Sequence, residues 1–144
     1  MTLYSGDRSR LTGSSNLQEL LWVLIVEDDP LVQAFVVEAL ADGGFEPGIA
    51  GSGEEAVNLL RADQGKYRAL VTDINLSDAV DGWEVAKQAR EIDPAFPIVY
   101  MTGASADQWA SHGVPNSVLL PKPFAPAQLV TAVSQLLNAG TPAP

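Results

Sequence analysis

The sequence predicts a doubly wound α/β fold, in which five helices cover a five-stranded parallel sheet of strand order 2-1-3-4-5. Short apolar runs alternate with segments of helical periodicity from residue 21 onward. Most of these runs are apolar at nearly every position, which is typical of parallel strands buried on both faces. The chain has 144 residues, 47% of them hydrophobic, and this is enough for one core in one domain.

Five apolar runs are expected to form the strands. They are residues 21–26, 45–50, 69–72, 97–101 and 117–120. The second run contains Pro47, which cannot donate a hydrogen bond to a neighbouring strand. We therefore expect this strand at an edge of the sheet, where the order 2-1-3-4-5 places it. Right-handed crossovers then put helices on both faces.

Helical segments are expected after each strand. Their centres are residues 32–40, 56–60, 85–89, 106–110 and 129–137. Gly43-Gly44 is expected to end the first helix, Asp81-Gly82 to begin the third, and Pro126 to lie in the first turn of the fifth. The fourth segment has the weakest apolar pattern, so a short helix is expected there.

Composition limits the possible partners and the location. Eighteen acidic and eight basic residues give a net charge of −10, which repels the phosphates of nucleic acids and anionic membranes. No apolar run approaches the roughly eighteen residues of a membrane span. The absence of cysteine excludes disulfides and thiolate zinc sites, and it suits a cytoplasmic protein. Proteins, metal ions and cationic ligands are the expected partners, and we expect a monomer or a weak dimer.

Three regions are expected along the chain: a flexible N-terminal leader over residues 1–20, a single domain over 21–138 and a C-terminal tail over 139–144. The leader lacks the apolar run of a signal peptide. The last helix is expected to end near Asn138, with only AGTPAP after it. We therefore expect no separate output domain for DNA binding or catalysis.

Charged and polar residues follow the predicted strands at their carboxyl ends, where this fold class binds ligands. These residues are Glu27, Asp28, Asp29, Asp73, Thr102 and Lys122. Clustered carboxylates repel one another, and a hard divalent cation relieves the repulsion. Magnesium suits such a site because it takes oxygen ligands and keeps other positions for water or phosphate. Asp73 is the expected nucleophile towards phosphorus, with Lys122 and Thr102 contacting the transferred phosphoryl oxygens.

Five strings in a fixed order carry a family resemblance: VLIVEDDP, LVTDINL, DGWEVA, VYMTGAS and LLPKPF. They are similar to the landmarks of response-regulator receiver domains of the CheY type, which have a flavodoxin/CheY-like fold. The resemblance covers about residues 21 to 138. It is closest to bacterial receivers that stand alone or are attached to hybrid sensor kinases.

The resemblance implies roles for the residues at the strand ends. Asp73 becomes the acceptor of a phosphoryl group from a histidine kinase or histidine phosphotransfer protein. Glu27 and Asp28 become the acidic pair of a Mg²⁺ site, which Asp73 and the backbone carbonyl of Asn75 complete. Thr102 becomes the switch hydroxyl.

The resemblance further implies that Lys122 contacts the phosphate and that the Lys122-Pro123 bond is cis. Asp29 is expected to open the first helix rather than to bind metal.

Four positions depart from the family pattern. Ser77 stands where the family usually has proline, and Gly82 comes one residue later than expected, so the loop after Asp73 is expected to be remodelled. Leu119 stands at a position that is usually aromatic, which puts the usual coupling to the switch threonine in question. Gly103 replaces a commoner alanine, which permits a more mobile loop.

Some of these residues also fit other interpretations. Asp28 and Asp29 before a proline are also typical helix-capping residues, and His112 is interpreted as a surface residue. The spacing of five residues matches an EF-hand calcium loop: Asp73, Asn75, Ser77, Asp81 and Glu84. That loop needs glycine at its sixth position, where this chain has Asp78, and a helix before it, where a strand is expected.

The favoured hypothesis is a single-domain response regulator that is phosphorylated on Asp73 and signals through protein contacts. It is expected to catalyse only its own phosphorylation and dephosphorylation, so it is not classed as an enzyme. Its partner is either a kinase for which it is a phosphate sink or shuttle, or a downstream target. The alternative is a binding module that keeps the fold and acts without phosphorylation.

Overall fold

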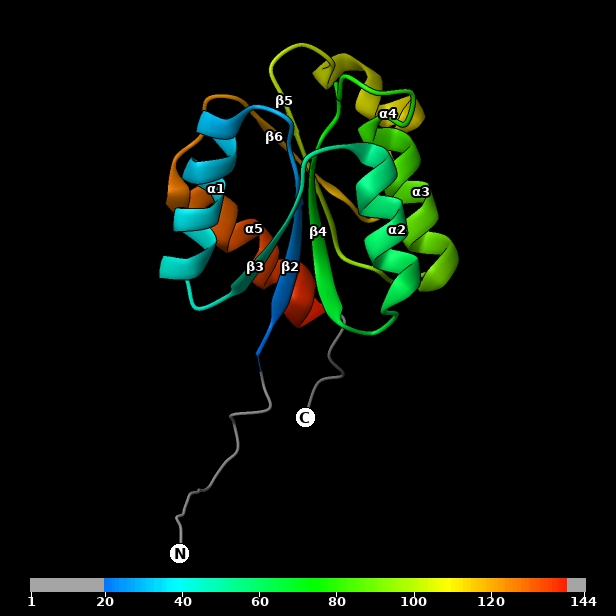
Figure 1. The fold of residues 1–144 in the computed structure, drawn as a ribbon. Helices are drawn as coiled ribbons and strands as arrows, with labels where there is room; N and C mark the ends of the chain where they lie inside the picture. The colour runs from blue at the N-terminus through cyan, green and yellow to red at the C-terminus, as the bar shows by residue number, and fades with distance from the viewer. Residues whose placement is uncertain (1–19, 140–144) are drawn as a thin grey trace, which may run out of the picture.

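The computed structural model describes residues 20–139, which form one parallel sheet with helices on both of its faces (Figure 1). The expected leader, apart from Leu20, and the expected tail, apart from Ala139, lie outside the described residues. The elements in chain order are β2 (Trp22–Val26), α1 (Pro30–Asp42), β3 (Glu46–Ala50), α2 (Gly53–Ala62), β4 (Tyr67–Asp73), α3 (Gly82–Ile92), β5 (Ile98–Thr102), η2 (Ala106–Gln108), α4 (Trp109–His112), β6 (Val118–Pro121) and α5 (Pro126–Ala139).

The strand order is β3-β2-β4-β5-β6, and every pairing is parallel. Counted from the first described strand, this is 2-1-3-4-5, so the predicted fold class is confirmed. The strand that contains Pro47 lies at an edge of the sheet, as predicted, and pairs only with β2. Because β3 lies at the edge, the missing N–H of Pro47 does not deprive a second neighbouring strand of a hydrogen bond.

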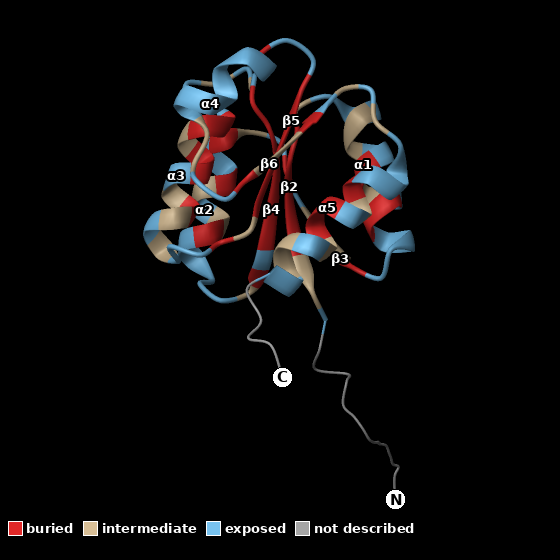
Figure 2. Cartoon of the chain, turned by 180° about the vertical axis from the view of Figure 1, so that it is seen from behind, coloured by how far each residue is buried: buried red, intermediate tan, exposed pale blue. Residues whose placement is uncertain are grey.

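Alternation along the strands divides the core into two layers. In β2, Leu24 and Val26 face the layer formed with α2 and α3, whereas Val23 and Ile25 face the layer formed with α1 and α5. All four side chains are fully buried, and Figure 2 shows the central strands as the most buried part of the chain. Burial on both faces explains why the sequence of β2 is an unbroken apolar run.

Side-chain caps fix where α1 and α3 begin. Asp29 caps α1 by accepting a hydrogen bond from the Leu31 N–H at 2.9 Å, and Asp81 caps α3 through the Glu84 N–H at 2.9 Å. Both caps were predicted. Gly43 ends α1 as predicted.

The fourth helical segment is shorter than the others. A 3₁₀ turn, η2, precedes a single α-helical turn, α4, and neither has a buried residue. The weak apolar pattern of this segment explains its length, because a helix without a buried stripe gains little from packing. No helix among residues 20–139 is long and apolar enough to cross a membrane.

Candidate functional site

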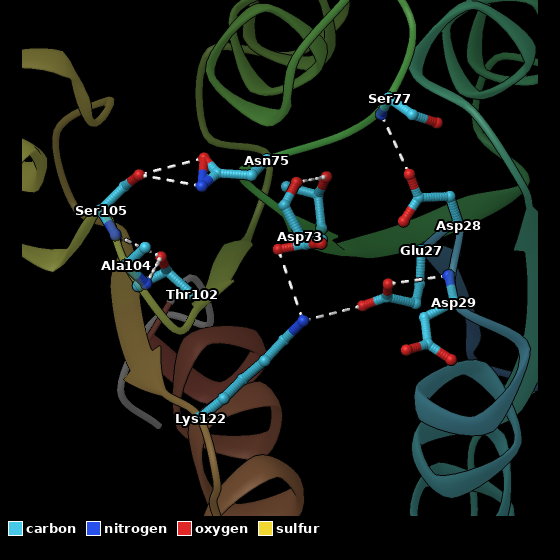
Figure 3. A network of polar contacts seen from close by, with 11 residues as sticks. Glu27, Asp28, Asp29, Asp73, Asn75, Ser77, Thr102, Ala104, Ser105 and Lys122 are labelled. Carbon is cyan, nitrogen blue, oxygen red and sulfur yellow. Dashed lines mark hydrogen bonds and ion pairs between the residues drawn. The ribbon is translucent and has the colours of Figure 1, made fainter.

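Three carboxylates converge at the carboxyl ends of two adjacent strands. Glu27 and Asp28 follow β2, and Asp73 is the last residue of β4 (Figure 3). One oxygen atom from each residue lies within 4.8 Å of the other two. The structure therefore brings together the three acids that the sequence analysis selected, at the sheet edge where the crossover direction reverses.

Burial makes this cluster costly to ionise. Glu27 is 1% exposed and Asp73 is 7% exposed, and burial raises the pKa of both carboxyl groups. Mutual repulsion between Glu27 and Asp73 raises the pKa of Glu27 further. Lys122 acts in the opposite direction on both acids. The site thus disfavours negative charge and gains from an added cation.

Lys122 reaches the cluster from the end of β6. Its Nζ atom lies 3.2 Å from Oε1 of Glu27 and 3.5 Å from Oδ1 of Asp73. Lys122 contacts two of the three carboxylates, so the fully ionised cluster, with the lysine included, carries two excess negative charges. This excess matches the charge of one divalent cation.

Glu27 is held on both carboxylate oxygens. Its Oε2 accepts a hydrogen bond from the Asp29 N–H at 3.0 Å, while Oε1 faces Lys122. The Gln33 side chain donates to the Glu27 carbonyl at 2.8 Å, a contact that the sequence analysis missed. Glu27 is therefore fixed by the protein, and Asp28 and Asp73 are the acids better placed to bind an ion directly.

Asp28 is held by the loop that follows β4. The Ser77 N–H donates to its Oδ2 atom at 2.9 Å, and hydrogen bonding with Ser77 lowers the pKa of Asp28 (Figure 3). Asp28 is not buried, so its carboxylate stays ionised at neutral pH. The loop after Asp73 thus makes a specific contact with the acidic cluster.

Thr102 ends β5, but its hydroxyl oxygen does not face the acids. It accepts hydrogen bonds from the Ala104 N–H at 3.1 Å and the Ser105 N–H at 2.7 Å, within the turn that follows its own strand. The sequence analysis expected a hydroxyl near the phosphorylation site. The structure places this hydroxyl at the expected carboxyl end of β5, where it is hydrogen-bonded to the turn that follows the strand (Figure 3).

Asn75 and Ser105 join the two loops beside the site. Asn75 Nδ2 donates to Ser105 Oγ at 3.1 Å, and Ser105 Oγ donates to Asn75 Oδ1 at 3.0 Å. Ser105 is buried, whereas Asn75 is exposed. This reciprocal pair links the loop after β4 to the loop that holds Thr102. The string VYMTGAS ends at Ser105, but the sequence analysis assigns this residue no role.

Gly82 allows the loop after Asp73 to close. A Cβ atom at this position would lie 2.1 Å from the Asp73 carbonyl oxygen, a distance that no side chain can occupy. The Gly82 N–H also donates to the Ile74 carbonyl at 2.9 Å. Glycine is therefore required where α3 begins against the end of β4.

The position that is usually aromatic is Leu119, which pairs with Tyr100 on the neighbouring strand. Tyr100 is fully buried, packs against Trp83 at a centroid distance of 4.8 Å, and accepts a hydrogen bond from the Val114 N–H. Tyr100 on β5 therefore places a buried aromatic ring on the strand beside Leu119. His112 is exposed, as predicted, and its ring lies 5.8 Å from that of Trp83.

The EF-hand interpretation fails on geometry as well as on sequence. Asp73 ends a strand, Asp81 caps a helix through the Glu84 N–H, and Asp78 bonds to the N-terminus of α2. These side chains point to different partners instead of one central ion.

Comparison with known proteins assigns the chain to a family. The family model for the response regulator receiver domain matches residues 23–134. The chain belongs to this family. A receiver domain is not a conventional enzyme. The Lys122-Pro123 peptide bond is cis, as the resemblance implied.

Several relatives share most of this receiver. The response regulator receiver protein CpdR of Brucella abortus is 33% identical over 119 residues, which are 81% of this chain and 97% of that protein. A receiver protein structure from Sinorhizobium medicae is 45% identical, covers 85% of this chain and 98% of its own, and has a TM-score of 0.82.

Other relatives are longer than this chain. The sensor kinase CckA of Brucella abortus is 30% identical over 81% of this chain and 12% of that protein. The chain spans 56% of the probable transcriptional regulator ycf29 of Porphyra purpurea and 52% of the transcriptional regulatory protein CusR of Escherichia coli. Receivers of this family thus occur within regulators and sensor kinases.

Proposed function

We propose that this receiver accepts a phosphoryl group on Asp73 from the phosphohistidine of a histidine kinase or phosphotransfer protein. An Asp73 carboxylate oxygen attacks phosphorus, the bond from phosphorus to the histidine nitrogen breaks, and an acyl phosphate forms while histidine is regenerated. The observation that carries the proposal is the convergence of Glu27, Asp28 and Asp73 with Lys122 at the carboxyl ends of the strands.

Magnesium fits the donor set. We propose that Asp28, Asp73 and the Asn75 backbone carbonyl hold the ion, with Glu27 completing the acidic pair. All are hard oxygen donors, and the cluster carries two excess negative charges when ionised. The bound ion neutralises charge on the transferred phosphoryl oxygens. A receiver of a Pseudomonas aeruginosa sensor histidine kinase, 23% identical with a TM-score of 0.70, is described with magnesium coordinated in its active-site cleft.

Lys122 and Thr102 are proposed to contact the phosphoryl group. The Lys122 ammonium already lies 3.5 Å from Asp73, so it can neutralise an oxygen on the new phosphate. The Thr102 hydroxyl oxygen accepts hydrogen bonds from the amides of Ala104 and Ser105, and we propose that it moves toward the phosphate and donates its proton to a phosphoryl oxygen. Its movement would alter the turn after β5, which couples phosphorylation to the surface around α4.

An apolar surface beside the site is suited to a protein donor. Leu31 is 83% exposed at the start of α1, and Phe35 and Phe124 pack together with ring centroids 5.8 Å apart. Exposed apolar side chains of this kind are typical of protein contact surfaces. We propose that the kinase or phosphotransfer protein docks here and that a partner protein reads the phosphorylated state. A single-domain regulator is supported by CpdR, which this chain matches over 97% of its length.

Chemical trapping tests the proposed acceptor. The chain is incubated with acetyl phosphate and Mg²⁺, and the acyl phosphate is then reduced with borohydride, which converts a phosphorylated aspartate to homoserine. Peptide mass mapping should find homoserine at position 73 and at no other aspartate. Homoserine at Asp28 or Asp29, or unmodified Asp73 in a chain that binds Mg²⁺, would contradict the proposed acceptor.

A further inference from the structure

We propose that Asp78 is a positioning residue of the phosphorylation site. Its carboxylate ties the loop after Asp73 to the first residues of α2, and this tie places two of the groups proposed to hold Mg²⁺. The inference rests on the proposed function and adds a residue that the family resemblance does not assign.

Asp78 acts as a remote cap of α2. Its Oδ1 accepts a hydrogen bond from the Gly53 N–H at 3.3 Å and its Oδ2 accepts one from the Glu54 N–H at 3.0 Å. The first N–H groups of a helix have no acceptor within the helix, and a carboxylate there is favoured by the helix dipole. Ser52, the local cap, serves the Glu55 N–H instead. The two caps therefore have separate partners.

A second, independent contact joins the same two segments. A Cβ atom on Gly53 would lie 2.1 Å from the Val80 carbonyl oxygen and 2.9 Å from its Cβ atom. The loop backbone thus lies directly against the start of α2, and only glycine permits this approach. Asp78 and Val80 together fix the middle of the loop to the helix.

The loop fixed in this way carries groups of the site. Ser77, immediately before Asp78, donates its N–H to the Asp28 carboxylate at 2.9 Å. Asn75, earlier in the same loop, supplies the backbone carbonyl proposed as a metal ligand. Movement of the loop away from α2 would release Asp28 and displace that carbonyl. The position of both ligand groups therefore depends on the Asp78 contact.

Titration with MgCl₂ by isothermal calorimetry tests the proposal on four folded chains: wild type, Asp78→Ala, Asp78→Asn and Ser52→Ala. Partners outside the first ligand shell change metal affinity by about 10- to 100-fold, and Asp78 acts one contact further out. We expect Asp78→Ala to weaken Mg²⁺ binding about 3- to 10-fold. Asp78→Asn keeps one acceptor oxygen and should recover part of the affinity.

Ser52→Ala is the matched control, because it removes a cap from the same helix without touching the loop. Its Mg²⁺ affinity should stay within about twofold of the wild type, while urea unfolding shows that both alanine variants lose similar stability. Equal loss of affinity in Ser52→Ala and Asp78→Ala would show that α2 stability alone matters, and would overturn the proposal.

Two further outcomes separate this inference from the proposed function. A wild type that binds Mg²⁺ and is phosphorylated on Asp73, with unchanged affinity in Asp78→Ala, would overturn the inference alone. A wild type that binds no Mg²⁺ would overturn both. If Asp78→Ala does not fold, Asp78→Asn decides the question, because an affinity equal to that of wild type despite the lost acceptor oxygen would contradict the positioning role.

Discussion

The Nζ atom of Lys122 lies 3.5 Å from Oδ1 of Asp73, although the two residues end strands that are separated by β5. The same ammonium group contacts Glu27 at 3.2 Å. A single lysine therefore offsets the repulsion between two buried acids. Its position also allows it to contact an oxygen of a phosphoryl group on Asp73.

Lys122→Ala should destabilise the chain in the absence of Mg²⁺. Two buried acids would lose their cation, and leaving buried charged groups without partners costs about 1–3 kcal/mol. Urea unfolding at neutral pH measures the loss, and added Mg²⁺ should restore part of it.

Lys87→Ala is the control, because Lys87 is exposed on α3. Its free energy of unfolding should change by less than about 0.5 kcal/mol. Equal stability of the two variants would show that Lys122 does not neutralise the acids.

Asp73→Asn should stabilise the chain without Mg²⁺ at neutral pH. The substitution keeps the shape of the side chain and removes one buried negative charge. Burial disfavours that charge, because it raises the pKa of the Asp73 carboxyl group. We expect a gain of about 1 kcal/mol in the free energy of unfolding. Differential scanning calorimetry in EDTA measures it, and a lower melting temperature than that of the wild type would argue against electrostatic strain at the site.

The stability of the wild type should depend on pH in a defined direction. The pKa values of Glu27 and Asp73 are raised in the folded chain. These two carboxyl groups therefore keep their protons in the folded chain at pH values where they have lost them in the unfolded chain. The stabilisation is complete below the unfolded pKa values and is lost as pH rises through the folded ones, from about pH 4 upward.

Urea unfolding across this pH range, in EDTA, measures the slope. The double variant Glu27→Gln, Asp73→Asn should reduce it, since neither side chain then titrates. An unchanged slope in the double variant would assign the pH dependence to other groups.

Gly82→Ala should destabilise the chain by about 2–4 kcal/mol, because its new Cβ atom would clash with the Asp73 carbonyl. Gly103→Ala is the matched control, since no atom lies within 4 Å of the position its Cβ would take. Chemical denaturation distinguishes the two. Similar stabilities would contradict the close approach of α3 to the end of β4.

Ser105→Ala should loosen the turn that holds Thr102. The substitution removes the reciprocal contact with Asn75, which is worth about 1 kcal/mol. The backbone amide hydrogens of residues 104 and 105 should therefore exchange with solvent about fivefold faster. Hydrogen exchange by NMR measures this rate.

Ser111→Ala, which alters an exposed hydroxyl of α4, serves as the comparison. Equally slow exchange at residues 104 and 105 in both variants would mean that the Asn75 contact does not restrain the turn.

Apolar periodicity predicted the layers of this fold because the pattern of each strand and helix is local. The unbroken run of β2, the proline of the edge strand and the cap residue Asp29 each carry their meaning within a few positions. The acidic cluster was predictable for a related reason. Parallel strands bring their carboxyl ends to one edge, so the residues after them meet whatever the intervening sequence.

The supporting contacts could not be predicted in the same way. Asp78 bonds to Gly53 and Glu54, and Ser105 bonds to Asn75, across long separations in sequence. Such pairs involve loop residues without periodicity, and their geometry depends on the conformation of both loops. The sequence pattern indicates for Asp78 only that it does not fit the sixth position of a calcium loop.

Intact mass spectrometry tests the central claim most directly. The chain is incubated with acetyl phosphate and Mg²⁺, beside Asp73→Asn and a wild-type sample in EDTA. The account predicts one phosphoryl adduct in the wild type, lost in the variant and in EDTA. The same adduct in Asp73→Asn, or no adduct in a wild type shown to bind Mg²⁺, would contradict the assignment of Asp73 as the phosphoacceptor.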